Sequence, residues 1–351
     1  MITIGLLIAA IVNNATKDRP TRASWQLPIA LQFIWGFVLA VGMILLPESP
    51  RWLIKKGRDQ DAAVALSRLI SLPPDHPEIR AELDEIRVSF QHEKELGESS
   101  YLDCFRPANK ILFRTFTGIA IQAWQQLTGI NFIIYYGTAF FKNAGISNPF
   151  LITIAINIIN VFMTPPGMWN VERLGRRRSL LIGAAGMCFC EYLVAIVGVT
   201  ISTENTAGQK VLVAFVCIYI AFFASTWGPI AWVVSGEIFP LNIRAKAMSL
   251  SIASNWLWNF ALGYATPYLV NKEPGSAGLG VKVFFIWGST CAGCFIFTYF
   301  CIPEVCLPLI PRQRWPRNLY PILDQGFIPR TDRNLVSEHH ADEVDCVSSS
   351  A

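Results

Sequence analysis

An apolar stretch near the middle of the chain carries an unusual density of amide side chains. Residues 122–141 read QAWQQLTGINFIIYYGTAFF, with three glutamines, one asparagine and two tyrosines. An amide in hydrocarbon is costly unless it is hydrogen-bonded, so we expect these side chains to face other helices or a watery cavity. The chemistry that suits them is the binding of hydroxyl groups, as in a polyol or a sugar. The alternative is that the amides only hold helices together, as in many membrane bundles.

The spacing of these amides predicts a break in the helix. Gln122, Gln125 and Gln126 share one helical face at about 100° per residue. A straight helix would turn Asn131 roughly 180° away from Gln122. Gly129 is the residue that permits a break, and broken membrane helices with polar side chains at mid-depth form the substrate sites of secondary transporters.

Two longer motifs resemble a known family. QQLTGIN followed by YY resembles the seventh helix of the sugar porter family in the major facilitator superfamily, and WQLPIALQFIWGFVLAVGMILLPESPRWL resembles its sixth helix and exit loop. The resemblance covers residues 1–304 and implies an all-α membrane protein that moves a hexose by alternating access, without a chemical step, a cofactor or a metal. The positions that it places around the sugar are Gln125, Gln126, Asn131, Asn160, Trp232, Asn255, Trp256 and Asn259.

Two of these positions are tryptophans inside apolar segments, next to residues that can bend or bind. Trp232 follows Gly228-Pro229, where the missing backbone donor predicts a hinge. Asn255 and Asn259 lie one turn apart, with Trp256 beside them. An aromatic face together with amides suits a sugar, whereas tryptophans that only mark the membrane interface would lie at segment ends.

Charged motifs mark three expected helix ends, and we expect them to form a gating network. Opposite charges at helix ends can pair in one conformation and separate in another, although an isolated exposed pair contributes only about 0–1 kcal/mol. The alternative is plain anchoring of the basic residues at the cytoplasmic surface. The family resemblance implies that the partner of Glu237 comes from the amino-terminal half. The residues of the network are Glu48, Arg51, Glu172, Arg173, Arg176, Arg177, Glu237 and Arg244.

Composition places the chain in a membrane. Of its 351 residues, 52% are hydrophobic and 15% charged, where soluble domains carry roughly 25% charged residues. The net charge is only +4 and the basic residues lie in short loops, so binding to nucleic acid is not supported. We expect a multi-pass protein, with the plasma membrane as its location.

Apolar segments divide the chain into four regions. The segments are 1–13, 26–46, 114–140, 149–169, 179–200, 210–236, 246–269 and 281–302. By the resemblance, residues 1–46 hold part of helix five and all of helix six of the amino-terminal bundle. Residues 114–304 form the carboxyl-terminal six-helix bundle, and 305–351 form an irregular cytoplasmic tail. The first segment is short for a span, so we expect further helices upstream and no sugar transport by this chain alone.

Residues 47–113 form a loop between the two regions of helices. The loop holds ten Lys and Arg residues, which predicts that it faces the cytoplasm. Apolar residues at helical spacing predict two amphipathic helices within it. Their apolar positions are Ala62, Ala63, Leu66, Leu69 and Ile70 in one helix and Ile79, Leu83, Ile86 and Phe90 in the other.

Glu191 is an acid deep inside an apolar run, and such a residue is a functional suspect by default. We expect it to make a structural pairing and not to carry a proton, because the resemblance places its helix at the periphery. The sequence does not determine whether a proton accompanies the sugar. Two other functions stay open, namely a transporter-like sugar sensor and an inactive fragment of a sugar porter.

Overall fold

The computed structural model describes residues 2–18, 20–95, 100–107, 110–143, 148–201, 205–240, 242–270 and 276–302. All regular elements within these residues are helical. The expected tail at 305–351 lies outside the described residues. The α-helices are α1 (Ile2–Thr16), α2 (Ala23–Leu45), α3 (Pro50–Lys55), α4 (Asp59–Ile70), α5 (Pro77–Glu95), α6 (Ile111–Leu127), α7 (Ile130–Asn143), α8 (Pro149–Leu174), α9 (Arg176–Thr200), α10 (Thr206–Ser225), α11 (Trp227–Glu237), α12 (Arg244–Val270) and α13 (Val283–Cys301). Two short 3₁₀ helices, η1 (Tyr101–Phe105) and η3 (Gly280–Lys282), connect them.

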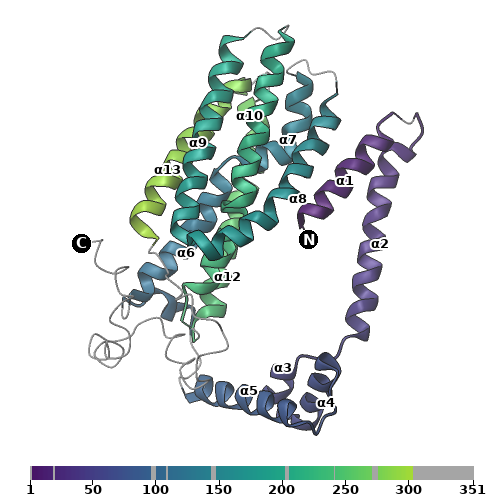
Figure 1. Ribbon diagram of the computed structural model, residues 1–351, viewed down its shortest axis with the longest axis vertical. Helices are drawn as coiled ribbons and strands as arrows, with labels where there is room; N and C mark the ends of the chain where they lie inside the picture. The colour runs from purple at the N-terminus through teal and green to yellow at the C-terminus, as the bar shows by residue number, and fades with distance from the viewer. Residues whose placement is uncertain are drawn as a thin grey trace.

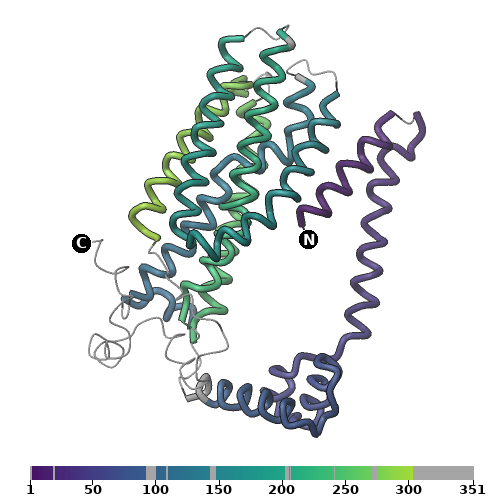
Figure 2. Tube along the Cα trace, viewed as in Figure 1, coloured from purple at the N-terminus to yellow at the C-terminus, as the bar shows by residue number. Residues whose placement is uncertain are grey.

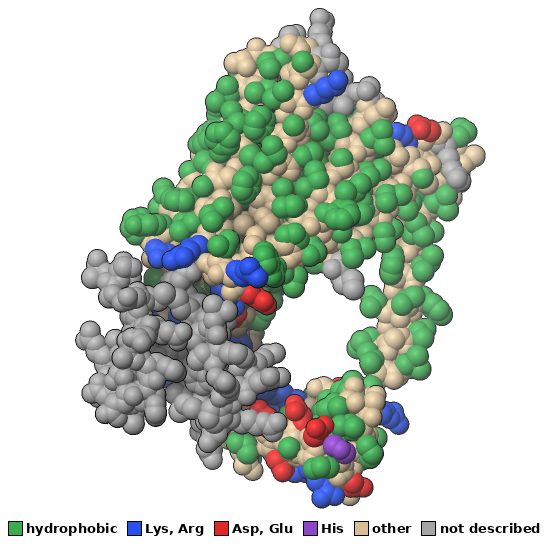
Figure 3. Space-filling model, in the orientation of Figure 1, with side chains coloured by type: hydrophobic (Ala, Val, Ile, Leu, Met, Phe, Trp, Pro, Cys, Tyr) green, Lys and Arg blue, Asp and Glu red, His purple; other side chains and the backbone are tan. Residues whose placement is uncertain are grey.

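The helices form three groups in space. Helices α6 to α13 stand together as one bundle, while α1 and α2 form a hairpin beside it (Figure 1). Helix α1 packs on α8, and the chain then descends along α2 to the group α3–α5 at the foot of the molecule before it enters α6 (Figure 2). Apolar side chains cover the flanks of the bundle and of α2 (Figure 3). Charged side chains gather on α3–α5 and at the lower end of the bundle, which points towards α3–α5 (Figure 3).

The expected apolar segments all lie on described helices, which confirms an all-α membrane fold. Five stretches are long and apolar enough to cross a bilayer, namely Ala23–Leu45, Pro149–Leu174, Arg176–Thr200, Ala207–Glu237 and Gly280–Cys301. The segment expected at 114–140 is split into α6 and α7, each shorter than a span. Helix α6 begins at Ile111, three residues before the expected boundary at 114.

The hinge expected at Gly228-Pro229 lies slightly earlier in the chain. Helix α10 ends at Ser225 and α11 begins at Trp227, so Thr226 is the break, with φ −134° and ψ −85°. Pro229 falls in the first turn of α11, where its missing N–H would have had no partner anyway. Proline therefore starts the second helix of this pair, and the bend precedes it.

The loop at 47–113 contains the two expected amphipathic helices, α4 and α5, and a short third one, α3. Leu66, Ile79 and Leu83 are buried in a small apolar cluster of their own. The prediction was wrong for Leu69 and Ile70, whose side chains are about half exposed. Helix α4 ends at a left-handed Ser71, and Leu72 beyond it packs on the cluster in their place.

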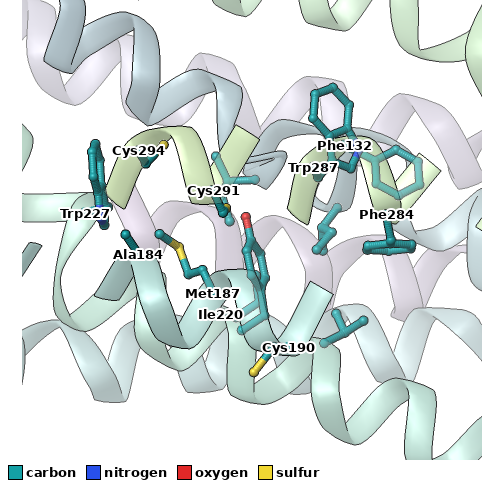
Figure 4. Close-up of a cluster of buried hydrophobic side chains, with 14 of the residues drawn as sticks. Phe132, Ala184, Met187, Cys190, Ile220, Trp227, Phe284, Trp287, Cys291 and Cys294 are labelled. Atoms are coloured by element: carbon teal, nitrogen blue, oxygen red, sulfur yellow. The ribbon is translucent and has the colours of Figure 1, made fainter. Parts of the chain in front are cut away.

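The core of the bundle is continuous from α6 to α13. Figure 4 shows its centre, where Met187, Trp227 and the thiols of Cys291 and Cys294 lie close to one another. The Trp227 indole is fully buried and donates to the carbonyl oxygen of Leu180 at 3.0 Å. This bond ties the start of α11 to α9 directly after the break at Thr226.

Candidate functional site

The expected break lies at Gly129, between α6 and α7. Gly129 has φ +84°, in the left-handed region that favours glycine. A Cβ atom on this residue would lie 2.7 Å from the indole ring of Trp287, so the space also requires glycine. The break turns α7 so that the Asn131 side chain donates a hydrogen bond to Gln126 Oε1. The rotation that the amide spacing predicted is therefore present.

One group of amides, which we call the clasp, consists of Gln122, Gln125 and Asn255. Asn255 Nδ2 donates to Gln122 Oε1 at 2.7 Å and to Gln125 Oε1 at 2.9 Å. Gln125 Nε2 donates to the carbonyl oxygens of Trp227 and Gly228 at 2.9 and 3.0 Å. All three amides are buried, and their bonds join α6, α11 and α12. For these residues the geometry favours the alternative in which amides hold helices together.

A second group of polar side chains, which we call the open cluster, lies across the break. Gln126 Oε1 accepts from Asn131 and, at 3.3 Å, from Asn259 Nδ2. Asn259 also contacts the Tyr135 hydroxyl at 3.4 Å, and the Tyr135 side chain is about half exposed. This cluster therefore extends from the buried break to an accessible surface.

The open cluster keeps free hydrogen-bonding atoms. Gln126 Nε2 and Asn131 Oδ1 form no hydrogen bond with another described residue. Neither atom is among the fully buried side-chain atoms that lack a partner, so both are at least slightly accessible. The open cluster thus retains one unused amide donor and one unused amide acceptor, one on each side of the break. Sugar hydroxyls can accept from the first and donate to the second.

Three expected sugar contacts stand apart from both groups. Asn160 on α8 is buried, Trp232 on α11 is 39% exposed and Trp256 on α12 is 63% exposed. No hydrogen bond among the described residues joins these side chains to the clasp or to the open cluster. Trp232 and Trp256 directly follow Ala231 and Asn255, which the clasp holds, so the clasp fixes the backbone that carries both indoles.

Four residues that contact the break or its amide groups were not among the expected site residues, namely Gln122, Tyr135, Tyr219 and Trp287. The amide spacing contained a signal for Gln122, and the YY motif contained one for Tyr135. Tyr219 and Trp287 lie in uniformly apolar runs, where nothing in the sequence distinguishes them. Their contacts with the break depend on how α10 and α13 pack against α6.

The charge network contains one well-formed pair. Arg176 donates from Nη2 to Glu237 Oε1 at 2.9 Å and from Nε to Oε2 at 3.2 Å. Arg176 starts α9 and Glu237 ends α11, so each charge lies at the helix end that disfavours it, and pairing offsets this cost. The family resemblance implied a partner from the amino-terminal half, whereas here Glu237 has a partner within the same bundle.

The other charged residues of the network have local contacts. Arg177 donates to the carbonyl oxygen of Tyr299 at 2.8 Å, and the Arg173 guanidinium lies 4.0 Å from the centre of the Trp169 ring. Arg244 donates to the carbonyl oxygen of Phe239 at 3.2 Å. Glu48 lies just before α3, Arg51 lies in the first turn of α3, and Glu172 lies in the last turn of α8.

Glu191 lacks the structural pairing that we expected for it. Its side chain is 1% exposed, and neither carboxyl oxygen has a hydrogen-bond partner of normal geometry among the described residues. The prediction failed because α9 faces α10 and α13, which offer thiols and a phenol at this level and no cation.

Comparison with known proteins identifies the family. A family model described as "Sugar (and other) transporter" matches residues 1–307. The major facilitator-type transporter ecdD of Aspergillus rugulosus is 49% identical, over 86% of this chain and 57% of that protein. The probable glucose transporter rco-3 of Neurospora crassa is also 49% identical, over 83% of this chain and 50% of that protein.

Two further comparisons extend the range of similarity. The high glucose sensor RGT2 of Saccharomyces cerevisiae is 43% identical, over 86% of this chain and 40% of that protein. A structure of the proton:xylose symporter XylE bound to 6-bromo-6-deoxy-D-glucose superposes with a TM-score of 0.66 and 25% identity, over 86% of this chain and 62% of that one. This chain thus spans about half the length of the curated relatives that it matches.

Proposed function

Since the chain belongs to the sugar transporter family of the major facilitator superfamily, we propose that it takes part in the transmembrane transport of a hexose. The observation that carries the proposal is the open cluster, which presents a free amide donor and a free amide acceptor at a helix break. Losing one such hydrogen bond to a sugar hydroxyl costs about 1–3 kcal/mol. Two or three of these bonds supply much of a millimolar affinity.

Alternating access supplies the mechanism, and no chemical step is needed. The breaks at Gly129 and Thr226 let α7 and α10 tilt on α6 and α11, which the clasp holds together. The Arg176–Glu237 pair latches α9 to α11 at the charged end of the bundle. Release of this pair would free α11 to move when the site changes the side that it faces.

The membrane orientation follows from the basic residues. The group α3–α5 and the Arg176–Glu237 end of the bundle would face the cytoplasm, with the plasma membrane as the location. Labelling in intact cells tests this orientation. A cysteine at position 178 should not react with an impermeant reagent, and strong labelling there would reverse the orientation.

A sugar sensor is the second candidate. The similarity to the high glucose sensor RGT2 favours it, because a sensor uses the same binding site and needs no net transport. Saturable uptake would identify a transporter, since both kinds of protein bind hexose and only a transporter moves it. Whether a proton accompanies the sugar is part of the same question, and uptake measured with and without a proton gradient addresses it.

The experiment combines binding and uptake. Labelled glucose is bound to the purified 351-residue chain in lipid nanodiscs, and uptake is measured in a host without hexose transport. Gln126→Ala should weaken binding about five- to a hundredfold. Asn157→Ala is the matched control, because Asn157 is a buried amide on α8 whose side chain, among the described residues, bonds its own helix at the Thr153 carbonyl oxygen.

Each outcome has a distinct meaning. Absence of glucose binding by the unmodified chain, or equal losses in Gln126→Ala and Asn157→Ala, would contradict the proposed site. Binding without uptake would favour the sensor or a binding-competent fragment. Saturable uptake above an empty-vector control would contradict our expectation that this chain does not transport sugar by itself.

A further inference from the structure

The end of α6 at the break is held by side chains from two other helices. The last carbonyl groups of a helix lack backbone partners, and a break inside a membrane cannot satisfy them with bulk water. Thr290 Oγ1 of α13 donates to the Leu127 carbonyl oxygen at 2.6 Å. The Tyr219 hydroxyl of α10 donates to the Thr128 carbonyl oxygen at 2.8 Å. The break is thus supported by side chains that do not belong to the open cluster.

The Tyr219 side chain is buried where it contacts the break. It is 1% exposed, and among the described residues its hydroxyl forms one hydrogen bond, to the Thr128 carbonyl oxygen. Thr128 directly precedes Gly129, so this bond fixes the carbonyl from which the chain turns into α7. The distance between the Gln126 and Asn131 side chains depends on that turn, because Gln126 lies at the end of α6 and Asn131 at the start of α7.

A second side chain lies next to this carbonyl group. The Cys291 thiol of α13 contacts the same Thr128 carbonyl oxygen at 3.8 Å. A thiol is a weak donor, so the Tyr219 hydroxyl is the stronger of the two contacts to this carbonyl.

We propose that Tyr219 is a positioning residue of the sugar site, which holds the Thr128 carbonyl so that Gln126 and Asn131 keep their binding geometry. Tyr219 acts through its direct hydrogen bond to that carbonyl. The proposal rests on the proposed function for its effect on sugar, but its effect on the break stands independently.

Two conservative substitutions test Tyr219 against a matched control. Tyr219→Phe removes only the hydroxyl that reaches Thr128. Tyr192→Phe removes a hydroxyl that contacts Ser289 Oγ at 2.9 Å, a bond between α9 and α13 that involves no atom of residues 127–131. We expect Tyr219→Phe to weaken glucose binding about three- to tenfold and Tyr192→Phe to leave it unchanged.

A further variant tests the second contact to the same carbonyl. Cys291→Ala removes the thiol that lies 3.8 Å from the Thr128 carbonyl oxygen, and we expect a smaller loss of glucose binding than in Tyr219→Phe, because a thiol is a weak donor.

The second readout is amide hydrogen exchange in nanodiscs, followed by mass spectrometry on peptides that cover residues 128–132. Faster exchange confined to this segment in Tyr219→Phe supports the positioning role, whereas uniform acceleration across α8 and α9 would indicate general destabilisation and overturn it. Unchanged exchange and unchanged binding in Tyr219→Phe would also overturn it. If the unmodified chain binds no glucose, the proposed function fails, and the exchange data still decide whether Tyr219 holds the break.

Discussion

Helices α2 and α9 are equally apolar, yet they differ completely in how they pack. The most apolar window of each has a mean hydropathy of 2.1, but 44% of that window is buried in α9 and none of it in α2. Both helices are long enough to cross a bilayer. Hydropathy therefore indicates that a helix can enter a membrane, and it does not indicate what the helix contacts there.

Small residues account for much of the difference. A Cβ atom added at Gly183 of α9 would lie 2.0 Å from Thr226 Oγ1, and one added at Gly186 would lie 2.6 Å from the Phe222 ring. Gly36 and Gly42 of α2 have no atom within 4 Å of the corresponding position. Because lipid tails are as apolar as leucine, close backbone approach and hydrogen bonds decide which helices associate. In α9 glycine permits that approach, and in α2 it faces open space.

The largest contrast between the two helices is expected for leucine truncation. Leu180 of α9 is fully buried, while Leu39 of α2 is 68% exposed. Leu180→Ala should lower the free energy of unfolding by about 2–3 kcal/mol through the cavity that it leaves. Leu39→Ala should change it by less than about 0.5 kcal/mol. Thermal unfolding in nanodiscs measures both, and equal effects would show that α2 is packed against a surface that the described residues lack.

Glycine replacement should give the next largest contrast. Gly183→Ala places a methyl group against Thr226, at the break between α10 and α11, and should cost about 1–3 kcal/mol. Gly36→Ala should be neutral or slightly stabilising, because alanine favours a helix by up to about 1 kcal/mol over glycine. The same unfolding assay compares them. A silent Gly183→Ala would mean that Thr226 moves aside without cost.

The smallest contrast concerns the charges at the two helix starts. Arg176→Gln breaks the pair with Glu237 and should cost about 1 kcal/mol, since the Glu237 side chain is 37% exposed and water screens the pair. Arg22 precedes α2 and has no ion pair among the described residues, so Arg22→Gln should be silent. Raising the salt concentration should lower the free energy of unfolding of the unmodified protein towards that of Arg176→Gln, because salt screens the ion pair. An effect of Arg22→Gln as large as that of Arg176→Gln would remove the contrast.

Much of the fold could be predicted from the sequence because it depends on local patterns. Apolar runs of sufficient length placed the membrane helices, and residues at helical spacing placed α4 and α5. The break at Gly129 could also be predicted, since the amides before and after it cannot share a straight face. The break at Thr226 was assigned slightly too late, because proline marks a helix start as readily as a bend.

The division of the amides into two groups was decided by tertiary structure alone. Gln125 and Gln126 are adjacent and identical in type, and no sequence pattern assigns one to the clasp and the other to the open cluster. The choice depends on where α11 and α12 present their carbonyl and amide groups, which are more than 90 residues away in the chain.

By itself the sequence determined the membrane class, the apolar helices and the break at Gly129. Only the tertiary structure decided that Tyr219 supports the break, that Arg176 pairs with Glu237 and that Glu191 has no conventional partner. The physical reason is range. Hydropathy and helix breaks depend on neighbours along the chain, whereas a buried hydrogen bond depends on which distant helix supplies the matching group.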